Sequence, residues 1–235
     1  PPRSTPKPSS AASDVYKRQL ISECTYANDP SSSELYAQEE DRLVKDIVEI
    51  LSQGGAVLMP VFALGKTQEM LAKLYRMKSE QRIPDVPIYV SGLGRVVSRI
   101  YNKYTRYLRR EGLPPIPLDR VGEVIDGYEK SSVRMLLNQP CIILATSGMI
   151  IEDTPSAIFA EEMIRSERHG IFLVGYVDPD LLGWRILNAK VGDQIDFGGR
   201  LVTVKCPNIR RYGFTSHAFR DQLLKMIEWL DPEHI

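Results

Sequence analysis

Small, hydroxyl-bearing and glycine residues follow the ends of the predicted parallel strands, where residue type and spacing could do chemistry. The segments are Glu23–Tyr26, Leu64–Thr67, Ser91–Gly94, Thr146–Gly148 and Gly175–Tyr176. The carboxyl ends of parallel strands meet at one edge of a sheet, where ligands bind. Hydroxyls and open backbone N–H groups at that edge suit anions, phosphate above all. A single loop of this kind is ordinary connecting chemistry, but five in one chain favour a ligand cleft.

The segment Cys141–Ser156 is the clearest of these strand ends. Its apolar run Cys141–Ala145 predicts a strand buried on both faces. The polar loop Thr146–Gly148 follows, and Thr154-Pro155 then marks the start of a helix, with an N-cap residue before a proline. The segment is therefore predicted to be strand, polar loop and helix.

Two glycine motifs near the predicted strand ends are incomplete. Gly65–Thr67 resembles the end of a phosphate-binding P-loop, but Pro60 stands where that motif needs its first glycine. Gly92-x-Gly94 resembles a dinucleotide fingerprint, but Val97 occupies the third glycine position. We therefore reject the P-loop, and the dinucleotide signal is weak.

A predicted helix from Arg95 to Arg110 carries a basic stripe. Its cations and tyrosines are Arg95, Arg99, Lys103, Arg106 and Arg110, with Tyr101, Tyr104 and Tyr107 between them. Such a stripe can follow a nucleic-acid backbone and stack on bases. From this helix alone, a solvated face with half-buried tyrosines is the favoured interpretation.

His217 is the histidine placed for chemistry. It is predicted at a helix start, directly after a strand over 211–214, and Glu23 at another strand end is its candidate partner. From the residues alone, a satisfied core interaction explains the pair. His169 is expected in the last turn of a helix, where a positive charge suits the helix dipole and the role is structural. His234 lies near the chain end and indicates nothing.

Strands alternating with helices must position these residues. The predicted strands are 20–24, 56–62, 87–91, 141–145 and 171–176. The first predicted helix begins at a capping box, Ser31-x-x-Glu34. Further helices are predicted over 67–78, 95–110, 128–138 and 156–169, and a last one begins at 215–218 and ends at Asp231. A hairpin is expected around Gly198-Gly199 within 193–214. This order predicts an α/β fold with a mostly parallel sheet flanked by helices.

Composition excludes several classes of protein. The 235 residues carry a net charge of zero and are 43% hydrophobic, so any basic surface is local. Three widely spaced cysteines form no disulfide framework and favour a reducing, cytoplasmic location. No apolar stretch is long enough to span a bilayer. Residues 1–19 are interpreted as a disordered tail or a foreign remnant.

Together, these segments resemble the β-CASP branch of the metallo-β-lactamase superfamily, which comprises nucleases such as ribonuclease J and the cleavage endonuclease of messenger-RNA 3′-end processing. The matching segments, in family order, are Leu20–Tyr26, Gly54–Leu71, Ala145–Met149, Gly175-Tyr176 with Gly183-x-Arg185, and Phe214–Ala218. The resemblance implies a last lactamase strand at 20–27, a β-CASP domain at 28–206 and a return into an incomplete lactamase domain at 207–235, with RNA entering between the two domains.

The resemblance also implies a function. The parent would be a zinc-dependent phosphodiester hydrolase that processes RNA, with His217 and Glu23 as catalytic residues. The phosphate- and RNA-binding residues would be Ser91, Gly92, Thr146, Ser147, Gly148, Arg95 and Arg99. Two zinc ions are expected in the parent, but no histidine precedes His169, so this chain is expected to supply no metal ligand and to be inactive alone.

Departures from the family pattern are Glu152–Thr154, Thr215 and Leu182–Trp184. Two alternatives stay open: a non-catalytic β-CASP subunit that binds RNA, and a nucleotide-binding domain with a doubly wound sheet. RNA is the expected partner, DNA is allowed, and no membrane is involved. The mode of cleavage and the choice between a monomer and a homodimer also stay open.

Overall fold

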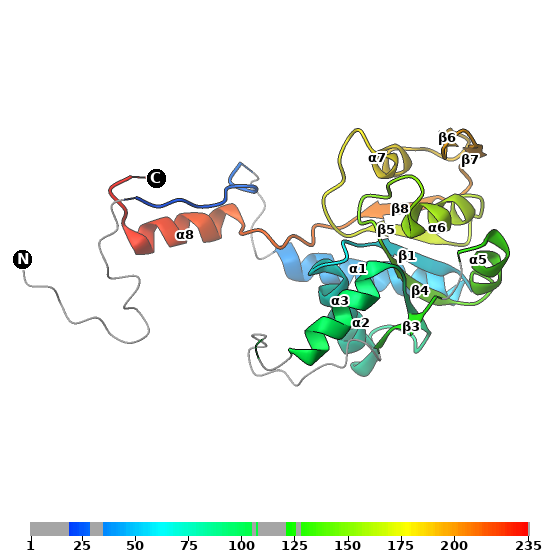
Figure 1. Cartoon of the computed structure of the whole chain (residues 1–235), viewed down its shortest axis with the longest axis horizontal. Helices are drawn as coiled ribbons and strands as arrows, with labels where there is room; N and C mark the ends of the chain where they lie inside the picture. The colour runs from blue at the N-terminus through cyan, green and yellow to red at the C-terminus, as the bar shows by residue number, and fades with distance from the viewer. Residues whose placement is uncertain (1–18, 29–34, 105–106, 108–120, 126–127, 235) are drawn as a thin grey trace, which may run out of the picture. The chain divides into compact units, whose positions relative to one another are not determined.

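The computed structural model describes residues 19–28, 35–104, 107, 121–125 and 128–234 (Figure 1). The chain divides into two compact units, Glu39–Phe214 on the one hand, and Pro1–Gln38 with Thr215–Ile235 on the other. The boundaries expected from the family resemblance remain predictions. The capping box at Ser31, the cations Arg106 and Arg110, and the predicted tail up to residue 18 lie outside the described residues.

A six-stranded parallel sheet forms the centre of the larger unit, which confirms the predicted α/β class. Its order is β3-β2-β4-β1-β5-β8. The strands are β1 (Ala56–Pro60), β2 (Ile88–Val90), β3 (Glu123–Val124), β4 (Cys141–Ala145), β5 (Gly170–Leu173) and β8 (Asn208–Arg211). All residues of β1 and β4 are buried, because uninterrupted apolar strands need cover on both faces.

Helices cover both faces of this sheet (Figure 1). They are α1 (Leu35–Ser52), α2 (Lys66–Ser79), α3 (Leu93–Lys103), α5 (Lys130–Leu136), α6 (Pro155–Met163) and α7 (Leu182–Leu187). Ala56 and Leu58 of β1 share one core with Phe159 of α6 and Ile186 of α7. The alternate residues of β1 point to the opposite face, where α1 and α2 lie (Figure 1).

Three sequence predictions about this unit were wrong in detail. The helix expected over 156–169 ends at Met163, because the N–H groups of Lys205 and Cys206 bind the carbonyl of Ile164 at 2.7 and 3.1 Å. The helix expected from Arg95 begins at Leu93 and ends at Lys103. The hairpin comprises only β6 (Gln194–Asp196) and β7 (Leu201–Thr203), while β8 joins the parallel sheet.

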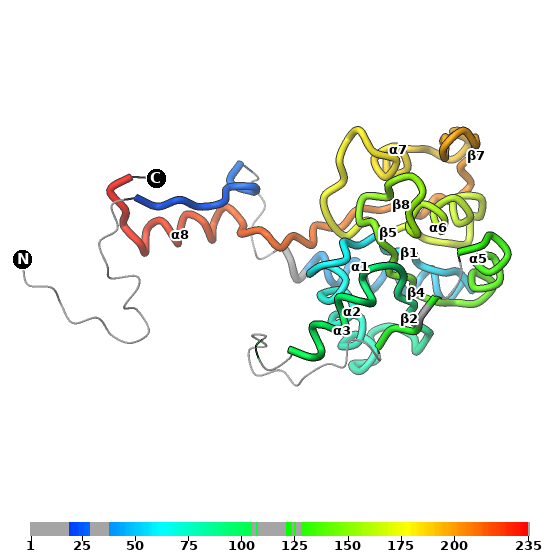
Figure 2. The backbone as a smooth tube through the Cα atoms, in the orientation of Figure 1, coloured from blue at the N-terminus to red at the C-terminus, as the bar shows by residue number. Residues whose placement is uncertain are grey.

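The smaller unit pairs an extended segment with one helix, α8 (Arg220–Leu230). Figure 2 traces the segment from Gln19 beside α8. The strand expected over 20–24 does not form; only isolated bridges occur, from Gln19 to His234 and from Tyr26 to Phe219. No helix within the described ranges is long and apolar enough to cross a membrane.

Candidate functional site

Three loops meet at the carboxyl edge of the neighbouring strands β2, β4 and β1. The N–H of Ser91, after β2, donates to the carbonyl of Leu144 at 3.0 Å. The N–H of Val61, after β1, donates to the carbonyl of Ala145 at 2.9 Å. A Cβ on Gly148 would lie 2.8 Å from the Phe62 nitrogen. The structure therefore brings the predicted residues Ser91, Gly92 and Thr146–Gly148 side by side.

Gly92 and Thr146 make the closest approach at this edge. Gly92 has a φ of +61°, and a Cβ there would lie 2.3 Å from Thr146 Oγ1. Only glycine satisfies both demands, because it has no Cβ and adopts positive φ freely. The Gly92 N–H donates to the hydroxyl of Tyr128 at 2.9 Å. That N–H is therefore engaged, whereas the sequence predicted an open one.

The hydroxyl of Ser91 is the polar group left over at the edge. Its side chain is 1% exposed, and its Oγ has no hydrogen-bond partner within the part of the chain that is described. A buried hydroxyl without a partner costs about 1–3 kcal/mol. By contrast, Ser147 Oγ accepts the N–H of Ile151 at 3.2 Å. An oxygen of a bound anion could accept a hydrogen bond from the Ser91 hydroxyl and so remove that cost.

Helix α3 carries Arg95 and Arg99 away from this edge. Its inward side is small and polar: a Cβ on Gly94 would lie 2.9 Å from Thr67, and Ser98 Oγ accepts a bond from Gln68 at 3.0 Å. Arg99 is exposed and Arg95 half-buried. Among the described residues, no carboxylate pairs with either arginine. Both are therefore available to an anionic ligand.

Gln68 and Lys66 hold these loops in place. This role was not predicted from the sequence for either residue. Gln68 Oε1 accepts the N–H of Gly65 at 2.8 Å, and its Nε2 donates to the carbonyls of Ala63 and Gly94 at 3.1 and 3.3 Å. Lys66 is 8% exposed, and its Nζ donates to the carbonyl of Phe214 at 2.9 Å. A glutamine three residues after a glycine that precedes a helix was the available signal, since it can cap the helix start.

Glu23 and His217 lie together in the smaller unit. Glu23 Oε1 accepts the N–H of Ala218 at 2.9 Å, Oε2 accepts the N–H of Thr25 at 3.0 Å, and His217 Nδ1 lies 3.3 Å from Oε2. The backbone N–H groups of Thr25 and Ala218 lower the pKa of Glu23 below its usual value, and His217 adds to this effect. Glu23 is therefore ionised over a wide pH range.

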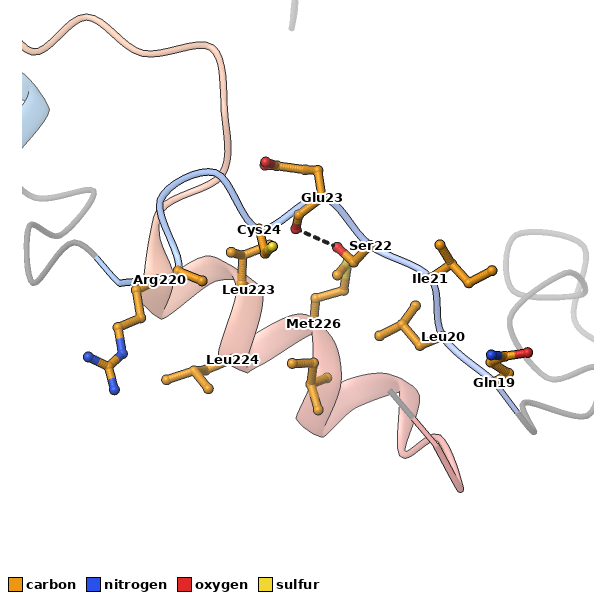
Figure 3. Close-up of a pocket in the computed structure, with 12 residues that line it drawn as sticks. Gln19, Leu20, Ile21, Ser22, Glu23, Cys24, Arg220, Leu223, Leu224 and Met226 are labelled. Carbon is orange, nitrogen blue, oxygen red and sulfur yellow. Dashed lines mark hydrogen bonds between the residues drawn. The ribbon is translucent and has the colours of Figure 1, made fainter. Parts of the chain in front are cut away.

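The surroundings of this pair differ from the sequence prediction in two ways. The side chains of His217 and Glu23 are 53% and 41% exposed, so the pair is no core interaction. His217 also precedes α8, whose N-cap is Phe219, and does not lie at the helix start. Beside the pair, the segment Gln19–Cys24 runs along α8 and lines an apolar groove of about 520 Å³ (Figure 3).

His169 is structural, but not for the predicted reason. It lies between α6 and β5, 3% exposed, and its Nδ1 accepts the N–H of Ala56 at 3.1 Å. Burial, together with the neighbouring Arg168, lowers the pKa of His169 to about 4. The imidazole is therefore neutral at pH 7, and the charge expected against a helix dipole is absent.

Metal ligands do not gather in the described ranges. No three His, Cys, Asp or Glu side chains described here lie where they could hold one metal ion. Cys24, Cys141 and Cys206 are free thiols. The described residues therefore do not fit the zinc ions that the family resemblance implies.

A family model named Beta-Casp domain matches residues 67–186. The chain belongs to the β-CASP family. It is 30% identical to a protein named transcription termination factor FttA from Lokiarchaeum sp., and 30% identical to one of the same name from Methanocaldococcus jannaschii. It is 26% identical to a protein named RNase aCSPSF2 from Saccharolobus solfataricus. These matches cover 91%, 91% and 89% of this β-CASP chain.

The chain spans only about a third of the length of these relatives. It covers 35% of each of the two FttA proteins and 39% of RNase aCSPSF2. The β-CASP family predicted from the sequence is thus confirmed.

Proposed function

We propose that this chain is the RNA-holding part of a longer, cytoplasmic phosphodiester hydrolase that processes RNA, and that it cleaves nothing alone. Membership of the β-CASP family supports the proposal, as does the likeness to a protein named an RNase. The longer relatives support the view that the whole protein contains more than this chain. Because the described residues form no metal cluster, zinc belongs to the longer protein in this proposal.

The observation that carries the proposal is the buried, unpartnered hydroxyl of Ser91 beside the Gly92–Thr146 contact. A backbone phosphate resting on Ser91, Thr146, Ser147 and Gly148 would accept hydroxyl protons there. Arg95 and Arg99 would neutralise the next phosphates along α3, since neither pairs with a described carboxylate. Such contacts hold RNA in place without reading its sequence.

In the proposed hydrolase, His217 donates a proton to the leaving oxygen. Glu23 faces Nδ1 of the imidazole at 3.3 Å, so Nε2 is the nitrogen left to carry that proton. Glu23 is itself fixed by two backbone N–H groups, and it orients the ring.

The binding test measures fluorescence anisotropy of a single-stranded RNA of about 20 nucleotides with the 235-residue chain. Binding should weaken steeply between about 50 and 200 mM salt. Replacing both arginines, Arg95→Gln with Arg99→Gln, should weaken binding and reduce the salt slope by about 1.4, or about 0.7 per lost phosphate contact. Lys190→Gln removes an exposed cation beyond α7 and is the matched control.

Three outcomes with the 235-residue chain would contradict the proposal. RNA affinity could be the same in the double variant and in the control. The 235-residue chain could cleave the RNA alone. A dinucleotide, and not RNA, could raise the unfolding temperature, which would favour a nucleotide-binding domain.

In the full-length protein, His217→Ala should lower cleavage by about 100-fold or more and leave RNA affinity unchanged. Full-length protein that binds RNA without cleaving it would indicate a non-catalytic subunit.

A further inference from the structure

Tyr26 stands between two aromatic rings of the smaller unit. Its ring is stacked on the His217 imidazole, with centroids 6.2 Å apart and planes 28° apart. On Phe219 its ring is tilted by 60° at a centroid distance of 6.2 Å. A backbone bridge also joins Tyr26 to Phe219. Phe219 therefore supports Tyr26, and Tyr26 in turn contacts the imidazole.

The imidazole of His217 needs such support. Its one polar side-chain contact within the described residues is Glu23 Oε2, 3.3 Å from Nδ1. One contact fixes one atom of a ring and leaves its plane free to turn, and the χ2 torsion of histidine is broad. The ring is also 53% exposed, so packing holds only part of it.

Glu23 cannot follow the imidazole if the ring turns. Each of its carboxylate oxygens already accepts a backbone N–H, from Ala218 and from Thr25. Phe219 is similarly fixed, because it is 9% exposed and its N–H donates to Gln222 Oε1 at 3.0 Å. The orientation of the imidazole thus depends on a partner that sets its plane, and the stacked ring of Tyr26 is in that position.

We infer that Tyr26 is a positioning residue, which holds the His217 ring so that Nδ1 faces Glu23 and Nε2 is presented to the leaving oxygen. This inference rests on the proposed role of His217 as proton donor. The face of the Tyr26 ring positions the imidazole, and this positioning does not require the phenol hydroxyl. A phenylalanine at position 26 should therefore keep the imidazole in place, whereas a leucine should not.

The test is nuclear magnetic resonance of the 235-residue chain at about pH 8.5, where free imidazole is neutral. Nitrogen shifts of the ring report which nitrogen carries the proton. In the unmutated 235-residue chain and in Tyr26→Phe, His217 should show the Nδ1–H form. Its ring protons should also be shifted by the neighbouring aromatic ring. In Tyr26→Leu both signatures should be lost, and the two nitrogen shifts should converge.

His169 is the internal control for the folding of the larger unit in this experiment. His169 and Ala56 both lie in the larger unit, and the Nδ1 of His169 accepts the N–H of Ala56. The proton of His169 is therefore on Nε2, and its signals should be the same in all three proteins. An unchanged Nδ1–H form of His217 in Tyr26→Leu would overturn the inference. A second readout does not depend on the leucine variant: the nuclear Overhauser contact between the rings of residue 26 and His217 should appear in the unmutated chain and in Tyr26→Phe, and its absence from both would also overturn the inference.

Cleavage assays with the full-length protein separate this inference from the proposed function. Tyr26→Leu should lower kcat at least about tenfold with KM unchanged, whereas Tyr26→Phe should keep the kcat of the unmutated protein. If His217→Ala leaves cleavage intact while Tyr26→Leu alters the tautomer, the proposed function fails and the positioning role stands. If His217→Ala abolishes cleavage while Tyr26→Leu changes neither tautomer nor kcat, Tyr26 has no positioning role.

Discussion

At the residue scale, His169 joins three parts of the larger unit. Its Nδ1 accepts the N–H of Ala56 at the start of β1, and its carbonyl accepts bonds from Cys206 Sγ and Asn208 Nδ2 at 3.1 and 3.3 Å. Protonation would place a second donor against the Ala56 N–H, and burial would keep water from compensating. The neutral imidazole is thus part of the folded structure.

The pKa of His169 predicts how stability depends on pH. The folded pKa of about 4 lies below the ordinary value of about 6.5. The unfolded chain therefore takes up a proton first as the pH falls, and the stability contributed by His169 is complete above about pH 6.5 and lost towards pH 4. The loss should be about 3 kcal/mol.

Urea unfolding at pH 7.5 and at pH 4.5 measures this loss. His169→Asn is the matched control, because its amide oxygen can accept the Ala56 N–H and does not titrate. Other groups titrate in both proteins, so the difference between them isolates His169. Equal losses in the two proteins would show that His169 is not the group responsible.

At the scale of elements, Lys66 ties the start of α2 to the chain that follows β8. A cation at a helix N-terminus opposes the helix dipole, and burial of its charge adds to the cost. Two contacts offset this cost: Lys66 Nζ lies 2.6 Å from Glu69 Oε2 and 2.9 Å from the carbonyl of Phe214. Lys66 thus holds the backbone immediately before the Thr215–His217 segment.

Replacing Lys66 by methionine should lower the free energy of unfolding by about 1–2 kcal/mol, since the hydrogen bond from Lys66 Nζ to the Phe214 carbonyl is lost. The methionine fills the same space, so the loss reports the polar contact and not a cavity. Lys66→Arg should keep most of the stability. Lys45→Met, at an exposed position of α1, is the surface control for urea unfolding at pH 7. Equal stability of Lys66→Met and Lys45→Met would contradict this role.

At the scale of the whole molecule, the chain contains two compact units and covers about a third of its relatives' length. In the ranges that are described, no side chains gather into a metal site. The stability of the described part of the chain should therefore come from apolar packing, hydrogen bonds and ion pairs.

Removal of metal should leave the isolated chain unchanged. Dialysis against a chelator should move its unfolding midpoint by less than about 1 °C, because a metal stabilises only a protein that binds it in the folded state. The full-length protein, for which we propose bound zinc, is the comparison, and on that proposal its midpoint should fall on chelation. Calorimetry measures both. A fall of several degrees in the isolated chain would reveal a metal site within it.

Much of the fold could be predicted from local sequence. The apolar runs at 56–60 and 141–145 became buried parallel strands, and Thr154-Pro155 marked the start of α6, because each signal lies within a few residues. The loops at the sheet edge were also predicted. Their location at one edge follows from the parallel direction of the strands, which alternating strands and helices imply. The order that makes β2, β4 and β1 neighbours is known only from the structure.

The sequence by itself determined the α/β class, the β-CASP family and the residues that follow β1, β2 and β4, but not the strand expected before Glu23. Only the tertiary structure decided that α6 ends where Lys205 and Cys206 bind the carbonyl of its C-cap residue Ile164, that His169 is neutral, and that Tyr26 stacks on His217. It also placed Glu23 on the N–H of Ala218, 195 positions away in the chain. Helix ends, protonation states and ring orientations depend on such distant partners, which local patterns in a sequence do not encode.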